Sequence, residues 1–170
     1  MAKINSKQKG SGYELKIAKL LSSWWGEEFH RTPCSGGLKW KEDNRVAGDI
    51  VTPTGSIFPF SIECKKREEW KFMHLIKGTG EIEDYWEQCT GDSDRVGLKP
   101  MLIFSKNFSP NYFMIRTEDF LKIVEHKNRV PMNFWTVQVL GKESRIVGIL
   151  DDFIGLVSKE DIIQSYNLNS

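Results

Sequence analysis

Three charged side chains flank a stretch that otherwise has the pattern of a buried strand pair. Asp49 precedes the uncharged run, and Glu63 and Lys65 end it with one residue between them. Burying charge without partners is costly, so such groups neutralise one another or hold an ion. Residues two apart in a strand share a face, which directs the Glu63 carboxylate and the Lys65 ammonium to one place. Asp49, on the preceding strand, can present a second carboxylate beside Glu63.

Two neighbouring carboxylates repel each other unless a cation lies between them. A hard divalent ion such as Mg²⁺ prefers oxygen ligands and lets water complete its coordination shell. The spacing therefore predicts a Mg²⁺ site held by Asp49, Glu63 and the backbone carbonyl of Cys64, with Mn²⁺ as a substitute ion. An Asp–Lys–Glu ion network on a solvated face accounts for the same spacing, and the pattern alone leaves both interpretations open.

Glu14 is a third candidate acid. It lies at the margin of the apolar stripe on a helix predicted over residues 11–25. From there it can reach the sheet face and hold a second ion or orient a water molecule. Ser11 and Glu14 also have the spacing of a capping box, in which Glu14 would only close the start of the helix. Both roles stay open.

Positive charge gathers in the first half of the chain, although the net charge of the whole is only +1. Residues 1–80 hold 14 Lys and Arg against 9 Asp and Glu, whereas residues 81–170 hold 10 against 14. This asymmetry permits a polyanionic partner on one face. A glycine-bearing loop follows the first predicted strand and places a tryptophan between two lysines, where a base or sugar can stack. The candidate nucleic-acid contacts are Arg31, Ser35, Lys39, Trp40, Lys41 and Lys66.

The order of predicted elements favours an α/β fold, with a central mixed β-sheet flanked by helices. Helices are predicted over residues 11–25, 67–77, 81–90, 117–127 (capped by Thr117) and 158–167 (capped by Ser158). Strands are predicted over residues 29–34, 46–52, 57–65, 99–105, 111–116, 134–140 and 144–150, with 46–52 and 57–65 joined as a hairpin. We expect a flexible basic arm over residues 1–10, a core over 11–116 and a C-terminal α/β extension of the same domain over 117–170.

Composition indicates a protein of the cytoplasm. The three cysteines have neither the spacing of a zinc site nor that of a disulfide framework, which points to a reducing compartment. No apolar run approaches the length of a membrane span, and no signal-peptide pattern opens the chain.

The order of the segments "GYELKIAKLL", "FHRTPCSGG", "AGDIV" and "IECKK" resembles the PD-(D/E)xK nuclease superfamily. Within it, the chain most resembles the archaeal-type Holliday-junction resolvases and their viral relatives. The resemblance covers about residues 11–105. The residues that fall on the positions of the family motifs are Glu14, Arg31, Ser35, Asp49, Glu63 and Lys65, with Gln88 matching a glutamine of the following helix.

This resemblance implies a restriction-endonuclease-like core and a Mg²⁺-dependent DNA endonuclease that nicks four-way junctions as a homodimer. It would act in the host-cell cytoplasm if the source is viral. Asp49 and Glu63 would hold the ion and Lys65 would assist the attacking water. Two other interpretations remain: a restriction-type endonuclease of linear DNA, and a DNA-binding module with an inactive nuclease fold. The intact charged residues argue against the last. The apolar segments 134–140 and 144–150 are the expected material for a dimer interface.

Overall fold

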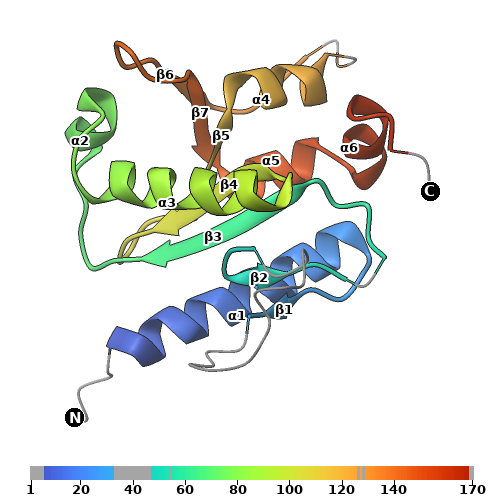
Figure 1. The fold of residues 1–170 in the computed structure, drawn as a ribbon, viewed down its shortest axis with the longest axis horizontal. Helices are drawn as coiled ribbons and strands as arrows, with labels where there is room; N and C mark the ends of the chain where they lie inside the picture. Colours follow the sequence, from blue (N-terminus) through green and yellow to red (C-terminus); the bar gives the residue numbers. More distant parts are fainter. Residues whose placement is uncertain (1–5, 33–46, 54, 126, 128, 169–170) are drawn as a thin grey trace.

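A five-stranded mixed β-sheet lies at the centre of the fold, with helices on both of its faces (Figure 1). The computed structural model describes residues 6–32, 47–53, 55–125, 127 and 129–168. The strand order is β3-β4-β5-β7-β6, in which β3 and β4 are parallel and every other pair is antiparallel. The strands are β3 (Phe60–Lys66), β4 (Lys99–Ser105), β5 (Tyr112–Arg116), β6 (Phe134–Val137) and β7 (Arg145–Ile149).

Six helices and a separate two-stranded sheet complete the described part of the chain. The helices are α1 (Ser6–Trp25), α2 (Phe72–Lys77), α3 (Glu81–Val96), α4 (Thr117–Val124), α5 (Leu150–Leu156) and α6 (Lys159–Ser165). The small sheet pairs β1 (His30–Arg31) with β2 (Ile50–Val51) in antiparallel register. No helix in the described residues is long and apolar enough to cross a bilayer.

Both faces of the central sheet are buried, and this explains the unbroken apolar run of β4. Met101 and Ile103 face the core that contains α1, α4, α5 and α6, whereas Leu102 and Phe104 face the core under α2 and α3. In Figure 1, α1 (blue) and α3 (green) lie on opposite sides of β3. The parallel β3–β4 pair requires a crossover, and α3 lies within it.

The structure confirms the predicted mixed α/β architecture and several of its elements. β4 has the predicted bounds, β6 and β7 form the predicted hairpin, and β7 lies inside the sheet between β5 and β6. The C-terminal segment therefore supplies two strands of the central sheet. Ser158 caps α6 in a capping box with Asp161, as predicted.

The start of α1 differs from the prediction. The helix begins at Ser6, so residues 6–10 are helical rather than part of an arm, and residues 1–5 lie outside the described residues. Ser11 is inside the helix and cannot be its N-cap, which makes the predicted capping box with Glu14 wrong. The start was misplaced because the apolar stripe of the helix, with Tyr13, Ile17 and Leu21 buried, becomes regular only after the first turn.

The predicted hairpin between residues 46–52 and 57–65 is also wrong. β2 pairs with β1, and the residues before it meet β3 in parallel, through a bridge between Gly48 and Ile62, rather than as an antiparallel hairpin. The intervening residues pack instead of pairing. The Phe58 ring lies 4.9 Å from that of Trp25 and 5.0 Å from that of Phe29, centroid to centroid, at the end of α1.

Smaller differences concern the helices. α3 continues six residues beyond its predicted end, because Gly97 in the left-handed conformation is what terminates it. Thr117 begins α4 but does not cap it; its hydroxyl lies 2.8 Å from that of Ser144. α5 was not predicted, because its short apolar face follows β7 without a turn signal.

A buried ion pair fixes α3 to the sheet. Arg145 of β7 is 1% exposed and donates from Nη1 to Glu83 Oε2 of α3 at 2.8 Å. Lys142 donates to the other carboxylate oxygen at 2.7 Å. Burial would raise the pKa of Glu83, but the bonds from Arg145 and Lys142 outweigh it and lower that pKa. The carboxylate thus stays ionised and compensates a guanidinium that cannot lose its proton.

Glu83→Gln should therefore destabilise the protein by about 3 kcal/mol, because it leaves the Arg145 charge buried opposite an amide. Urea unfolding of wild type and variant at neutral pH measures the difference. The lowered pKa of Glu83 means that its contribution is present above the unfolded-state pKa and is lost on acidification, so the difference should shrink in acid. Glu87→Gln is the control, since Glu87 is exposed and lies 3.4 Å from the same Lys142. Equal stability of Glu83→Gln and wild type would contradict this account.

Candidate active site

Glu63 and Lys65 project from the same face of β3, as the strand spacing predicted. Lys65 Nζ lies 2.5 Å from Glu63 Oε1, and Gln88 Nε2 of α3 donates to the same oxygen at 2.9 Å. Glu63 is 2% exposed, because α3 covers this face of the strand. The alternative of an ion network on a solvated face is therefore wrong for Glu63.

Asp49 is held against the outer edge of β3 by two hydrogen bonds. Its backbone N–H donates to the Ile62 carbonyl at 2.8 Å, and its Oδ2 accepts from the Cys64 N–H at 2.9 Å. Within a strand, the N–H and C=O of one residue point to the same side. The Cys64 carbonyl therefore faces the same edge as the Asp49 carboxylate, which is where the predicted backbone ligand has to lie.

Gly48 makes this close approach possible. Its φ is +75°, and a Cβ at this position would lie 2.2 Å from the Ile62 carbonyl oxygen. Thr32 holds the same segment from its other side: its N–H donates to the Asp49 carbonyl at 2.8 Å and its hydroxyl to the Gly48 carbonyl at 3.0 Å. Thr32 was not among the predicted site residues, because a threonine just after a short strand gives no signal of such a role.

Glu14 and Arg31 form an ion pair next to this edge. Arg31 Nε lies 2.6 Å from Glu14 Oε2, joining α1 to β1. Burial is the largest cause of the raised pKa of Asp49. The Glu14 charge also raises this pKa and the Arg31 charge lowers it, so both charges act on the Asp49 carboxylate. The structure thus brings Glu14, Arg31, Asp49, Glu63 and Lys65 into one electrostatic cluster.

Burial is the main cause of the shifted acidities in this cluster. It raises the pKa of Asp49, and together with repulsion from Asp49 it raises the pKa of Glu63 to about 7. Burial would lower the pKa of Lys65, but the bond and attraction to Glu63 outweigh it and raise that pKa. Two acids that resist ionisation beside each other are the electrostatic signature of a cation site.

The donor set fits a hard divalent ion. Among the described residues, no group of three or more His, Cys, Asp and Glu side chains is placed to hold a metal. Mg²⁺ does not need such a cage, because it binds through one or two carboxylates and keeps several waters. Asp49, Glu63 and the Cys64 carbonyl are oxygen donors of this kind. Burial raises the pKa of the Cys64 thiol well above its usual value, so its sulfur stays protonated and is a poor ligand.

Among the described residues, the other one predicted to contact nucleic acid does not lie in this cluster. Lys66 points to the opposite face of β3, where its Nζ donates to Ser105 Oγ at 3.1 Å and to the Lys106 carbonyl at 2.7 Å. Ser35, Lys39, Trp40 and Lys41 lie outside the described residues.

Tyr85 is an unpredicted neighbour of the site. Lys65 Nζ lies 5.3 Å from the centre of the Tyr85 ring, and the Tyr85 hydroxyl accepts a hydrogen bond from Arg67. The spacing from Tyr85 to Gln88, one turn of α3, was the available signal.

This combination of an aspartate beside the edge strand, an E-x-K strand and a helix glutamate on an α/β sheet defines the class of PD-(D/E)xK nucleases. The family model described as "Phage putative PDDEXK endonuclease" matches residues 5–164, and the chain belongs to this family. The match confirms the predicted superfamily and the restriction-endonuclease-like core.

A curated relative extends the similarity over nearly the whole chain. The chain is 25% identical over 167 residues to "Protein D14" of Escherichia phage T5, an alignment that covers 95% of this chain and 99% of the relative. Both comparisons agree with the expectation of a viral relative. No solved structure matches the chain significantly.

Gly48→Ala should displace Asp49 from β3, because the new Cβ meets a backbone oxygen that cannot move aside. We expect the amide of Cys64 to lose its protection from hydrogen exchange in the variant. Gly55→Ala is a matched control: Gly55 has a φ of +74°, but a Cβ added there would have no atom within 4 Å. It should show only the backbone strain of about 1 kcal/mol, with Cys64 still protected. Equal protection of Cys64 in both variants would contradict the role given to Gly48.

The raised pKa of Glu63 implies that the ionised Glu63 carboxylate lowers the stability of the metal-free protein. A carboxyl with a folded-state pKa of about 7 favours folding when protonated, and this contribution is lost as pH rises through that value. Glu63→Gln should therefore raise the melting temperature at pH 8 more than at pH 5, with the exposed Glu69→Gln as control. Mg²⁺ should stabilise wild type more than Glu63→Gln at pH 8. A variant less stable than wild type at pH 8 would show that Glu63 is not strained by burial.

Proposed function

We propose that the protein is a Mg²⁺-dependent endonuclease that hydrolyses phosphodiester bonds in DNA. The observation that carries the proposal is the position of two carboxylates, the buried Glu63 and the partly buried Asp49, at the Glu63–Cys64 peptide of β3, with Lys65 bonded to Glu63. Membership of a phage family described as endonucleases supports the reaction class.

Asp49, Glu63 and the Cys64 carbonyl would hold the ion. When bound, the ion would supply an activated water and neutralise charge that develops on the phosphate. Lys65 has a raised pKa, so it remains an ammonium at neutral pH. This favours Lys65 as a donor that orients the attacking water and stabilises the negative transition state, rather than as a base.

The neighbouring residues would position these groups. Gln88 donates to Glu63 Oε1 and so fixes the direction of the second carboxylate oxygen. Glu14 holds Arg31 at the edge of the site, and this pair is suited to binding a second ion or a water through Glu14 and a strand phosphate through Arg31. Ser35, Lys39, Trp40 and Lys41 would extend the contact along the DNA backbone.

We further propose four-way junctions as the substrate and a homodimer as the active form. The order of the motifs, which resembles junction resolvases, supports the substrate. Two matched nicks on a two-fold symmetric junction are most simply made by a two-fold symmetric dimer. β6 is an edge strand with Phe134 and Trp135 exposed, and the Phe72 ring of α2 lies 5.5 Å from that of Trp135, which gives apolar material for an interface. β7, the other segment predicted for the interface, is an interior strand and does not offer such a surface.

The test is cleavage of labelled four-way junction, flap, Y-fork and linear duplex, with Mg²⁺ and with EDTA. We expect Mg²⁺-dependent nicks in the junction. Asp49→Asn and Glu63→Gln should slow cleavage by about 10³-fold, or ~4 kcal/mol of barrier, because each removes a ligand charge. Lys65→Ala should slow it by about 10²-fold. Asp84→Asn, an exposed carboxylate of α3, is the control and should cut like wild type.

Each outcome has a defined meaning. Equal cutting of linear duplex and junction would favour the restriction-type alternative, and full activity of Glu63→Gln would remove the assigned site. No cleavage of any DNA by wild type would leave a binding module. Light scattering of the same samples reports assembly, and a mass near twice the 19.6 kDa of one chain is expected.

A further inference from the structure

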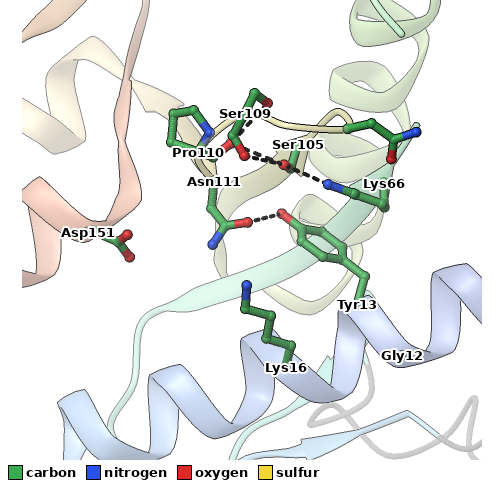
Figure 2. Close-up of a pocket in the computed structure, with 10 residues that line it drawn as sticks. Gly12, Tyr13, Lys16, Lys66, Ser105, Ser109, Pro110, Asn111 and Asp151 are labelled. Carbon is green, nitrogen blue, oxygen red and sulfur yellow. Dashed lines mark hydrogen bonds between the residues drawn. The ribbon is translucent and has the colours of Figure 1, made fainter. Parts of the chain in front are cut away.

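A pocket of about 490 Å³, lined mostly by polar and charged residues, lies on the face of β3 opposite to Glu63 (Figure 2). Residues from α1, from the ends of β3 and β4, from the connection to β5 and from the start of α5 form its walls. A volume of this size is within the range of small-ligand sites. Its lining residues are Gly12, Tyr13, Lys16, Lys66, Ser105, Asn107, Ser109, Pro110, Asn111 and Asp151.

Two lysines face this pocket from different elements. Lys16 extends from α1 toward the Tyr13 hydroxyl and Asn111, and Lys66 enters from the end of β3 (Figure 2). Among the described residues, no ion pair joins either lysine to a carboxylate. Burial, followed by repulsion from Lys16, lowers the pKa of Lys66. Two ammonium groups that repel each other across a cavity are stabilised by an anion between them.

The hydrogen bonds of Lys66 leave room for a ligand. An ammonium carries three donors. Lys66 gives one to Ser105 Oγ and one to the Lys106 carbonyl, which holds the group at the pocket wall. The third is available to a ligand oxygen in the pocket.

The lining also indicates which part of a nucleotide fits. Tyr13 is only 7% exposed, its hydroxyl donates to Asn111 Oδ1 at 3.1 Å, and Lys66 Nζ lies 5.8 Å from the centre of its ring. The ring therefore has little free face on which a base can stack. Ammonium, hydroxyl and amide groups are the usual partners of phosphate and sugar.

Among the described residues of the lining, Asp151 is the one carboxylate. It stands at the start of α5, away from Lys66 across the pocket in Figure 2. The negative charge of Asp151 disfavours binding of an anion on its side of the pocket. A phosphate is therefore expected on the lysine side, next to α1 and the end of β3.

We propose that this pocket is a second phosphate-binding site, in which Lys16 and Lys66 hold a phosphate group of a nucleic-acid strand. The inference rests on the proposed function for the source of the phosphate. Lys65 and Lys66 are adjacent in β3, and Tyr13 and Glu14 are adjacent in α1. The two sites thus share both elements, and a strand that passes the edge of β3 can occupy both.

The first arm of the test uses free ligands without Mg²⁺. Inorganic phosphate and a deoxynucleoside 5′-monophosphate are titrated by calorimetry and by the amide NMR signals of the pocket residues. If a terminal phosphate is the ligand, Lys16→Gln should weaken nucleotide binding at least tenfold. Lys19→Gln, an exposed lysine on the same helix outside the pocket, should leave it unchanged. Asp151→Asn should tighten binding of an anion and would weaken binding of a cation.

The second arm uses DNA, with every protein also carrying Asp49→Asn so that cleavage plays no part. If an internal phosphate of the strand is the ligand, Lys16→Gln should lower DNA affinity and reduce the slope of log affinity against log salt by about one. Lys19→Gln again serves as control. If Lys16→Gln weakens binding in the first arm, the ligand is a terminal phosphate. If it weakens binding in the second arm alone, the ligand is an internal phosphate of the strand.

The proposal is overturned if Lys16→Gln and Lys19→Gln behave alike in both arms, or if Asp151→Asn weakens phosphate binding. Circular dichroism of each variant ensures that a loss of binding is not a loss of folding. Failure of the proposed function is distinguishable from failure of this inference. It would appear as absence of cleavage by wild type, which leaves both binding measurements unaffected.

Discussion

The contact between Asp49 and the outer edge of β3 is the interaction on which the rest of the site depends. Two hydrogen bonds, from the Asp49 N–H to the Ile62 carbonyl and from the Cys64 N–H to the Asp49 carboxylate, replace what would otherwise be a strand pairing. They place the Asp49 carboxylate beside the backbone of the E-x-K strand. Gly48 allows the segment to approach the backbone of β3 this closely, and Thr32 holds it there.

The same arrangement explains how charge is tolerated inside the fold. Glu63 is covered by α3, and its cost is reduced by donors from Lys65 and Gln88. α3 in turn is held by a second buried carboxylate, Glu83, whose partner Arg145 comes from β7, three strands away from β3 in the sheet. One acid is fully neutralised and serves stability. Glu63 keeps a pKa of about 7, so a nearby positive charge would still stabilise its ionised form. This property supports a functional role for Glu63.

Sequence reasoning succeeded where periodicity is strong or a motif is local. The stripe of α1, the apolar run of β4 and the shared face of Glu63 and Lys65 follow from spacing alone. It failed where structure depends on distant partners. β1 and β2 have two residues each, too few for a period, so the pairing of β2 was assigned to the wrong neighbour. The Glu83–Arg145 pair joins residues 62 positions apart, and the Tyr13–Asn111 bond joins residues 98 apart, which no local pattern reveals.

The outer edge of β3 also has a consequence for solubility. A strand at the border of a sheet presents unpaired backbone groups that can join another chain and begin aggregation. Here the segment that carries Asp49 occupies the N–H of Cys64 and the carbonyl of Ile62. Asp49, the proposed metal ligand, thus also protects the edge of the sheet from pairing with another chain. Lys65 and Lys66 at the end of β3 add electrostatic repulsion between copies. Loss of Asp49 would therefore uncover this strand edge as well as remove the proposed metal ligand.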